Sequence, residues 1–311
     1  MEKKTVTVIG SYNVGLFLKG DVLPNPGETV IGNHFYEGGG GKGSNQAIAA
    51  AMMKANARFI GKIGNDKYGQ DALDLYKRVG VSPDLIKIDD SIHTGISVIL
   101  IDKKGQNLIS VVPGANFRLS KADIDGCLDK LQDSFLVGFQ LENNFEIIEY
   151  GIQKVSSLGL KTLLDPAPAR ELPDSLYPFI NYIKPNEHEA STLTGIKVVD
   201  IETAKKAGYW FLEKGVDTAI ITLGEGGSVL VTAEQAAHFP AASVNAIDTT
   251  GAGDCYCGAL MAFLAKGESI GQAIRYASSA AAISVTRLGV VEALPDLNET
   301  ETFLKSGRID S

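Results

Sequence analysis

The most informative stretch of the chain is Asp248-Thr249-Thr250-Gly251-Ala252-Gly253-Asp254, which leads into a run of small and apolar residues up to Ala265. Its glycines stand where a loop is expected to become a helix, and a helix start offers unpaired backbone N–H groups and the positive end of a dipole to an anion. A bound phosphate repels a nearby carboxylate, so Asp254 is unfavourable at this place unless it has a function. The function we expect is to accept a proton from an attacking hydroxyl. Together, the anion-binding turn and the base indicate phosphoryl transfer.

Composition and charge narrow the class of protein. The 311 residues are 44% hydrophobic and 21% charged, which is typical of a globular protein of one large or two smaller domains. The net charge of −8 argues against a nucleic-acid or anionic-membrane binder, which needs a basic face. No apolar stretch reaches the roughly 18 residues of a membrane span, and a strand-like run starts at Val6 without room for a signal peptide. Since the three cysteines form neither a disulfide framework nor a zinc set, we expect a cytoplasmic protein without nucleic-acid or membrane partners.

Strand and helix patterns alternate along most of the chain. Strand-like runs lie at residues 6–10, 58–63, 135–141, 161–164, 182–184 and 218–222. Helical patterns lie at residues 44–54, 69–79, 121–131, 145–158, 187–193 and 201–213, and three more follow at 252–265, 269–286 and 297–305. This alternation predicts an α/β fold, in which helices cover both faces of a central, mostly parallel sheet.

Two segments, about 14–36 and 94–112, interrupt the alternation. Each holds two strand-like pieces around a turn signal, Asn25-Pro26-Gly27 in the first and Asp102-Lys103-Lys104-Gly105 in the second, with no helical pattern to cover them. We expect these pieces to form a small separate sheet that acts as a lid on a single domain spanning residues 1–311. A half-covered sheet exposes an apolar face, so it needs a ligand or a second subunit against it, and we expect a homodimer through the lid sheet.

A glycine-rich run precedes the first long helical pattern and reads Glu37-Gly38-Gly39-Gly40-Gly41-Lys42-Gly43-Ser44-Asn45-Gln46. It fits the GxGxxG pattern of dinucleotide-binding proteins, which leaves an NAD(P)-dependent oxidoreductase as a remote alternative, but a hairpin rather than the first strand comes before it. Glycines in a loop let a ligand approach the backbone, Lys42 supplies a cation, and Asn45 supplies an amide one turn later. These groups suit a neutral polyol such as a sugar. The alternative is a flexible loop with a surface lysine and a helix cap.

Further short motifs are spread over nearly the whole chain. They are Gly10-Ser11-Tyr12-Asn13, Pro26-Gly27-Glu28-Thr29, Gly64-Asn65-Asp66-Lys67-Tyr68-Gly69, Pro113-Gly114-Ala115-Asn116, Gln140-Leu141-Glu142, Asp165-Pro166-Ala167-Pro168-Ala169-Arg170, Lys184-Pro185-Asn186-Glu187-His188-Glu189, Thr222-Leu223-Gly224-Glu225-Gly226-Gly227 and Ser284-Val285-Thr286-Arg287-Leu288-Gly289. With these motifs and the two glycine runs, the chain resembles the ribokinase family of sugar kinases, the PfkB superfamily, nearly from end to end.

The resemblance implies a ribokinase-like fold and an ATP-dependent transfer of the γ-phosphate to a primary hydroxyl of a sugar. The leading assignment is D-ribose, giving D-ribose 5-phosphate. Asp254 would be the catalytic base. The anion hole would be formed by Gly251, Ala252 and Gly253. The sugar would be bound by Asn13, Gly41, Lys42, Asn45, Glu142 and Asp254.

For the nucleotide and the ions, the resemblance implies further groups. The nucleotide would be bound by Asn186, Thr222, Gly224, Gly227, Gly253 and Ser278. Mg²⁺, arriving with ATP, would be reached by Glu189 through water. An activating K⁺ would be held mostly by backbone carbonyls at Asp248, Thr250, Ser284, Arg287 and Gly289. Two alternatives stay open, because Asn186 and Glu189 have the spacing of a capping box and Arg287 could be an ordinary surface charge.

One position departs from the family pattern. Ribokinases carry Asn-x-Asp after the first strand, and the Asp grips sugar hydroxyls, whereas this chain reads Asn13-Val14-Gly15. A hydrogen bond to a charged group contributes about 1.5–3 kcal/mol, or roughly ten- to a hundredfold in affinity. Either ribose binds weakly, or the extra space at Gly15 accepts another pentose, a hexose or a deoxy sugar. A non-catalytic sugar-binding regulator is a remoter alternative.

Overall fold

The main sheet is built from nine strands within residues 4–306, the part of the chain that the computed structural model describes. In spatial order they are β15 (Ala236–Phe239), β14 (Ser228–Val231), β13 (Thr218–Thr222), β12 (Tyr182–Ile183), β11 (Lys161–Leu164), β10 (Ser134–Phe139), β1 (Thr5–Ile9), β4 (Asn56–Ile60) and β6 (Val81–Ser82). Neighbours are parallel from β6 to β13, and β14 and β15 add an antiparallel edge. The mostly parallel sheet is confirmed, whereas β6, β14 and β15 were not predicted.

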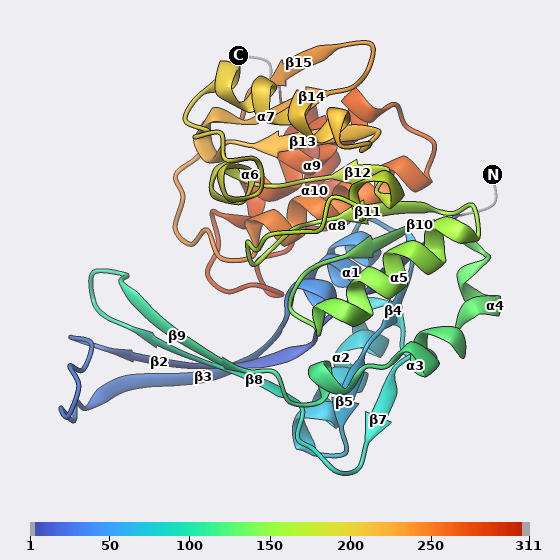
Figure 1. The fold of residues 1–311 in the computed structure, drawn as a ribbon. Helices are drawn as coiled ribbons and strands as arrows, with labels where there is room; N and C mark the ends of the chain where they lie inside the picture. Colours follow the sequence, from blue (N-terminus) through green and yellow to red (C-terminus); the bar gives the residue numbers. More distant parts are fainter. Residues whose placement is uncertain (1–3, 307–311) are drawn as a thin grey trace.

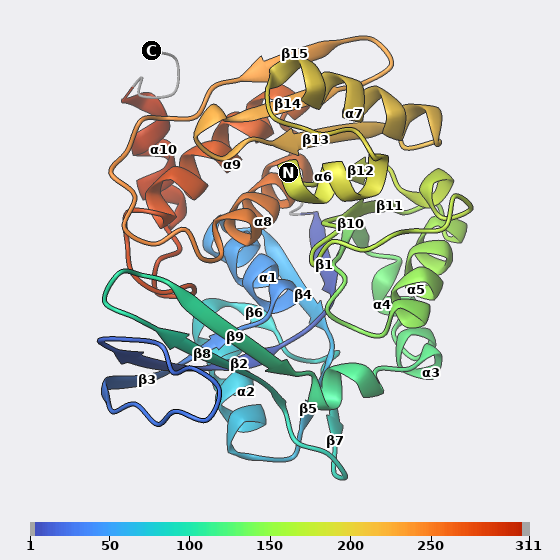
Figure 2. The ribbon, with the colours of Figure 1, turned by 60° about the vertical axis from the view of Figure 1, so that its left-hand side comes forward.

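Helices cover both faces of this sheet (Figures 1 and 2). They are α1 (Lys42–Met52), α2 (Lys67–Val79), α3 (Lys121–Asp125), α4 (Leu128–Leu131), α5 (Phe145–Ser157), α6 (Glu187–Thr194), α7 (Ile201–Glu213), α8 (Ala252–Ala265), α9 (Ile270–Ser284) and α10 (Leu297–Lys305). Successive side chains of a strand point to opposite faces. Val6 and Val8 of β1 therefore pack with α1, α2, α8 and α9, whereas Ile9 packs with α5, α6 and α7. Within residues 4–306, no helix has both the length and the apolar character needed to span a bilayer.

A separate four-stranded sheet projects from one side of the molecule (Figure 1). Its strands, in spatial order, are β3 (Gly32–Gly40), β2 (Asn13–Gly20), β8 (Gly95–Ile101) and β9 (Asn107–Val112). The central pair, β2 and β8, is parallel, and each outer strand is antiparallel to its neighbour. The small separate sheet expected from the two interrupting segments is confirmed. A two-stranded sheet of β5 (Lys62–Gly64) and β7 (Lys87–Asp89) lies near its base.

The glycine-rich run before α1 is mostly a strand. β3 continues to Gly40, so the loop expected at residues 37–40 is wrong, and Gly41 alone separates the strand from α1. These glycines are extended because they pair with residues 13–15 of β2, and an ideal Cβ on Gly39 would lie 2.6 Å from a leucine of α2. A dinucleotide fingerprint needs a turn between the first strand and a helix. The dinucleotide-binding interpretation is therefore wrong as well.

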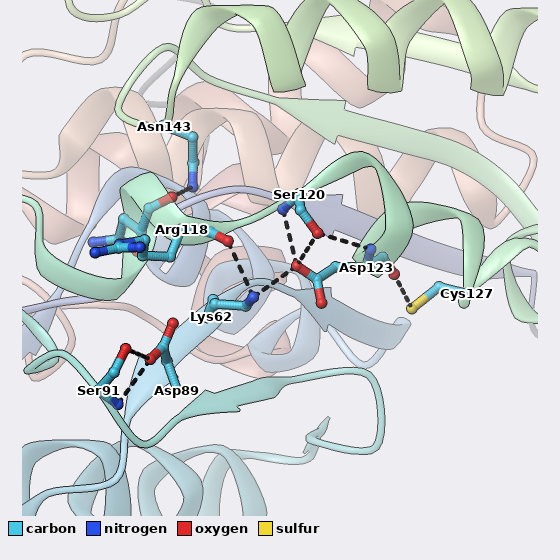
Figure 3. Close-up of polar contacts among 9 residues, drawn as sticks. Lys62, Asp89, Ser91, Arg118, Ser120, Asp123, Cys127 and Asn143 are labelled. Carbon is cyan, nitrogen blue, oxygen red and sulfur yellow. Dashed lines mark hydrogen bonds and ion pairs between the residues drawn. The ribbon is translucent and has the colours of Figure 1, made fainter.

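The short 3₁₀ helix η1 (Gly114–Arg118) joins the small sheet to the main body. Figure 3 shows the contacts that hold it: Lys62 Nζ donates to the Arg118 carbonyl at 3.0 Å, and Asn143 Nδ2 donates to the backbone carbonyl of Asn116 at 3.0 Å. Lys62 also pairs with Asp123 of α3 at 2.7 Å. The segment that follows β9 is thus fixed to β5, to α3 and to the loop after β10.

Candidate active site

The start of α8 is shaped by glycine backbone. Gly251 precedes the helix with a φ of 76°, and an ideal Cβ there would lie 2.7 Å from Val290. Glycine is therefore required both by the left-handed conformation and by the lack of space. No side chain from residues 4–306 caps this helix start. The Ala252 N–H donates to the Thr249 carbonyl at 3.3 Å, a long hydrogen bond that an anion would have to replace, and Gly253 follows it in the first turn.

Asp254 lies in that first turn and is buried, with 4% of its surface exposed. Two amides of α1 hold its carboxylate: Asn45 Nδ2 donates to Oδ2 at 2.8 Å, and Gln46 Nε2 donates to Oδ1 at 3.2 Å. These contacts form because α1 and α8 pack side by side, although Asn45 and Asp254 are 209 positions apart (Figure 2). A buried carboxylate with a fixed orientation is suited to accepting a proton from a bound hydroxyl.

Lys42 supplies the positive charge of the pocket. The negative charge of Asp254 raises the pKa of Lys42 well above its ordinary value, although burial alone would lower it. The neighbouring amide oxygen, Asn45 Oδ1, is buried and has no hydrogen-bond partner among residues 4–306. An open acceptor beside a cation suits a ligand that carries hydroxyl groups.

The other candidate sugar residues meet where α1 begins. Glu142 Oε2 accepts hydrogen bonds from the Ser11 hydroxyl and from the backbone N–H of Lys42. Gly41 has a φ of 88°, and an ideal Cβ there would lie 2.8 Å from the Asn13 nitrogen, so only glycine fits. The structure thus brings together all the candidate sugar residues, namely Asn13, Gly41, Lys42, Asn45, Glu142 and Asp254.

Asn13 is itself held in place by Asn116 of η1. The Asn116 side chain accepts from the Tyr12 N–H at 3.0 Å and donates to the Tyr12 carbonyl at 2.9 Å. It also donates to Asn13 Oδ1 at 2.9 Å. The start of β2 and the amide of Asn13 are therefore oriented together.

An ion pair that the sequence analysis did not single out lies beneath the start of α8. Lys184 Nζ is 3.1 Å from Asp165 Oδ1, and both side chains are almost fully buried. Burial alone would lower the pKa of Lys184, but the charge of Asp165 reverses this effect and raises it. Burial raises the pKa of Asp165 to about 6, and the lysines Lys184 and Lys42 oppose a further rise. Each partner therefore favours the charged form of the other and opposes the effect of burial.

Asn186 and Glu189 form a capping box at the start of α6. The Glu189 N–H donates to Asn186 Oδ1 at 2.8 Å, and the Asn186 N–H donates to Glu189 Oε2 at 2.9 Å. The capping interpretation is thus confirmed, and any further role of the two side chains stays a prediction. Thr222, the last residue of β13, lies beside Asn186, because these residues form an isolated parallel bridge just beyond β12.

The remaining candidate nucleotide residues lie on two elements. The 3₁₀ helix η3 (Gly224–Gly226) follows Thr222, and Gly227 leaves it with a φ of 86°. Ser278 lies on α9 and is almost buried. Among residues 4–306, no group of three or more His, Cys, Asp and Glu side chains is arranged to hold a metal ion. Mg²⁺ bound by ATP phosphates and one distant carboxylate fits this arrangement, because the ion keeps several waters.

The candidate K⁺ residues come from two segments that the structure places side by side. The Asp248 carboxylate accepts from the Thr250 N–H at 3.0 Å and from the Gly289 N–H at 3.3 Å. Ser284 ends α9, and its carbonyl accepts from the Arg287 N–H at 3.1 Å. The Arg287 guanidinium pairs with Glu299 of α10, so its side chain is engaged as a helix-end charge. Carbonyl oxygens near a carboxylate fit a hard monovalent cation.

The space expected at Gly15 is filled, which corrects that expectation. An ideal Cβ on Gly15 would lie 2.6 Å from Cε2 of Phe17, two residues along on the same face of β2. The Phe17 ring stacks on Tyr36 of β3, with centroids 4.5 Å apart. These rings line a cavity of about 310 Å³, which is also lined by Leu288, Gly289, Val290 and Glu292.

A kinase for a small hydroxylated substrate needs backbone groups that can bind an anion, a base and a compensating cation. This site has the glycine-shaped start of α8, the buried carboxylate of Asp254 and the charge of Lys42 acting on it. The chain belongs to the pfkB family of carbohydrate kinases, whose sequence profile matches residues 3–297. Similar proteins include a ribokinase of Haemophilus influenzae, 36% identical and covering 97% of this chain and 99% of its own. A deoxyribokinase of Salmonella typhi is 32% identical, over 96% of this chain and 98% of its own. The structure of an Arabidopsis thaliana ribokinase complexed with ribose and ATP superimposes with a TM-score of 0.90 at 28% identity. The match covers 97% of this chain and 99% of the Arabidopsis chain.

The family resemblance and the fold inferred from the sequence are confirmed, and the protein is an ATP-dependent sugar kinase, a phosphotransferase acting on an alcohol group. The oxidoreductase and the non-catalytic regulator are thereby set aside. Motif matching missed Gln46, Phe17, Asp165 and Lys184 as side chains of the site. For Phe17 a signal existed, since a residue two positions after Gly15 in a strand lies on the same face.

Proposed function

We propose that this kinase transfers the γ-phosphate of ATP to the primary hydroxyl of a pentose, with D-ribose as the first candidate and D-ribose 5-phosphate as product. The observation that carries the proposal is the buried Asp254 carboxylate, held by Asn45 and Gln46 at the uncapped start of α8. The full-length similarity to a ribokinase supports ribose.

In this mechanism, Asp254 accepts the proton of the sugar hydroxyl as it attacks the γ-phosphorus. The backbone N–H groups of Gly251, Ala252 and Gly253, at the start of α8, stabilise the charge on the transferred group. The ammonium of Lys42 stays protonated and offsets the charge of Asp254 in the substrate-free enzyme. Asn13, Gly41, Asn45 and Glu142 orient the sugar, and water is excluded when the small sheet closes as a lid.

The nucleotide and its ions are assigned to the far side of the same turn. Asn186, Thr222, Gly224, Gly227 and Ser278 bind ATP. Glu189 would reach the Mg²⁺ of MgATP through water, and the ion would supply positive charge to the phosphates. K⁺ would be held mostly by backbone carbonyls at Asp248, Thr250, Ser284, Arg287 and Gly289, with the Asp248 carboxylate turned towards it, and would help to keep the shape of the anion hole.

A deoxy sugar is the second candidate substrate, and a specific observation favours it. The family's carboxylate is missing at Gly15, and the ring of Phe17 covers that position. Phe17 and Tyr36 thus present an apolar surface next to Asn13, on the side where hydroxyls would need a partner. A deoxy sugar has one hydroxyl fewer, so it leaves fewer hydroxyls without a hydrogen-bond partner against the Phe17 and Tyr36 rings. The similarity to a deoxyribokinase supports this candidate.

For the assembly we propose a single kinase domain of residues 1–311 that dimerises through the lid sheet in the cytoplasm. Across the sheet, Phe35, Leu18, Leu100 and Leu108 stand in register in one row, on the face opposite Phe17. Phe35 is 60% exposed and Leu108 is 51% exposed. An apolar row of this kind is what a second copy would cover. The three cysteines are free and buried, which suits a reducing compartment.

The test is a screen for ADP release with MgATP and KCl over pentoses, hexoses, deoxy sugars and nucleosides. We expect the highest kcat/KM with ribose or 2-deoxyribose, and a product phosphorylated on the primary hydroxyl. Release of ADP only with nucleosides, or at a rate independent of added sugar, would contradict the assignment.

A further inference from the structure

Gln46 is fully buried next to Asn45 on α1, and no role follows for it from the family motif. Its Nε2 donates to two carboxylates, Asp165 Oδ2 at 2.8 Å and Asp254 Oδ1 at 3.2 Å. Its Oε1 accepts from Gln140 Nε2 at 2.6 Å. Ionised carboxylates only accept hydrogen bonds, so the nitrogen of Gln46 must face them and its orientation is determined.

These contacts continue into a closed ring around the first turn of α8. Asp165 pairs with Lys184 at 3.1 Å, and Lys184 Nζ donates to the carbonyl of Gly253 at 3.3 Å. Gly253 is followed by Asp254, which returns to Gln46. The ring therefore includes both the backbone of the candidate anion hole and the candidate base.

We propose that Gln46 is a positioning residue for phosphoryl transfer. Its amide holds the Asp254 carboxylate in one orientation and ties it to the Asp165–Lys184 ion pair, so that base and anion hole keep a fixed relation. This inference rests on the role proposed above for Asp254.

A purely structural role would not call for this arrangement. Two carboxylates that share one amide repel each other in a buried place, and a buried charge is costly unless it is compensated. Thr7 in the middle of β1 and Ser134 at the start of β10 show a less costly arrangement, since their buried hydroxyls hydrogen-bond to each other at 2.7 Å. An amide between two carboxylates is useful where a base must stay ionised and aimed at a substrate.

Opposite charges face one another around this ring. Lys42 faces Asp254 from α1, and Lys184 faces Asp165 from the end of β12. Glu142 and Glu189 add negative charge that acts on Lys42 and on Lys184 respectively. A further carboxylate at position 46 would upset this balance, whereas an apolar side chain would remove the tie without adding charge.

Three variants of the full-length kinase test the proposal by kcat, KM for sugar and ATP, and the pH dependence of kcat. Gln46→Met keeps the length of the side chain and removes its hydrogen bonds. We expect kcat to fall about ten- to a hundredfold, as for a base displaced by a fraction of an ångström, with both KM values within about threefold of wild type. Gln46→Glu is nearly isosteric, and its charge should move the acidic limb of the pH profile to higher pH by about one unit or more. Thr7→Val is the matched control for a lost buried hydrogen bond, and its kcat and pH profile should stay at wild-type values.

The proposal is overturned if Gln46→Met keeps kcat within about twofold of wild type, or if the pH profile of Gln46→Glu superimposes on that of wild type. Should Gln46→Met fold poorly, the pH profile of Gln46→Glu decides alone. Asp254→Asn distinguishes a failure of the proposed base role of Asp254 from a failure of the proposed positioning role of Gln46. Normal turnover in that variant would remove the base assignment and this inference with it, whereas an inactive Asp254→Asn beside normal Gln46 variants would remove only the inference.

Discussion

The wall formed by Phe17 over Gly15 leads to a prediction about sugar specificity. An aspartate placed at residue 15 meets the Phe17 ring, because its Cβ would lie 2.6 Å from Cε2 and 3.0 Å from Cζ. Gly15→Asp alone must push the ring from its stack on Tyr36, and an aromatic pair contributes about 0.5–1.5 kcal/mol to stability. The double variant Gly15→Asp/Phe17→Ala has no such conflict. Its carboxylate can accept from the sugar, which is worth about 1.5–3 kcal/mol.

We therefore expect the double variant to raise kcat/KM for ribose by about ten- to a hundredfold, and to raise it less for 2-deoxyribose, which offers one hydroxyl fewer. The assay is ADP release with each sugar at saturating MgATP. Phe35→Ala is the control, because Phe35 lies on the opposite face of the same sheet and should leave the ratio between the sugars unchanged. An unchanged ribose-to-deoxyribose ratio in the double variant would refute the reasoning.

Three further predictions concern the ion pair, the cation and the assembly. Asp165→Asn leaves Lys184 buried without its partner and should lower the free energy of unfolding, measured by urea titration, by about 3–5 kcal/mol. The double variant Asp165→Asn/Lys184→Met should recover most of this loss. Equal stability of the single variant and wild type would speak against a buried ion pair. Replacement of KCl by tetramethylammonium chloride should lower kcat, and Asp248→Ala should abolish this dependence; a wild-type enzyme indifferent to monovalent ions would eliminate the cation site. Sedimentation should find a dimer that Phe35→Glu converts to a monomer, and a monomeric wild type would remove the lid-sheet interface.

Helices were predicted well where local signals mark their ends. The range 201–213 agrees with α7, whose start is capped by Asp200. The range 121–131 is instead two short helices, because the chain turns at Gly126 and Cys127 between α3 and α4. A periodic apolar pattern continues across such a break, so periodicity alone does not reveal it.

The strands that escaped prediction depend on contacts far along the chain. β14 has four residues and is fully buried, which is too short for a clear alternation. The glycines at the end of β3 carry no apolar pattern, and they are extended because they pair with β2 and pack close to α2. Their conformation is set by tertiary contacts rather than by local preference.

The site could be predicted as far as motifs reach. Its glycines and Asp254 stand in short motifs, and the glycines in them indicate where the backbone takes an unusual conformation, such as the left-handed one of Gly251. Gln46 and Asp165 are ordinary residue types 119 positions apart, and only the packing of the fold brings them to 2.8 Å. The filled space at Gly15 was missed because the aromatic neighbour was not considered together with the strand period.

Asp254→Asn tests the central claim most directly. In ADP-release assays with ribose and MgATP, we expect kcat to fall about 10²–10⁴-fold, because the amide cannot accept the hydroxyl proton. Calorimetric Kd values for sugar and for ATP should stay close to those of wild type. Turnover within about tenfold of wild type would contradict the account.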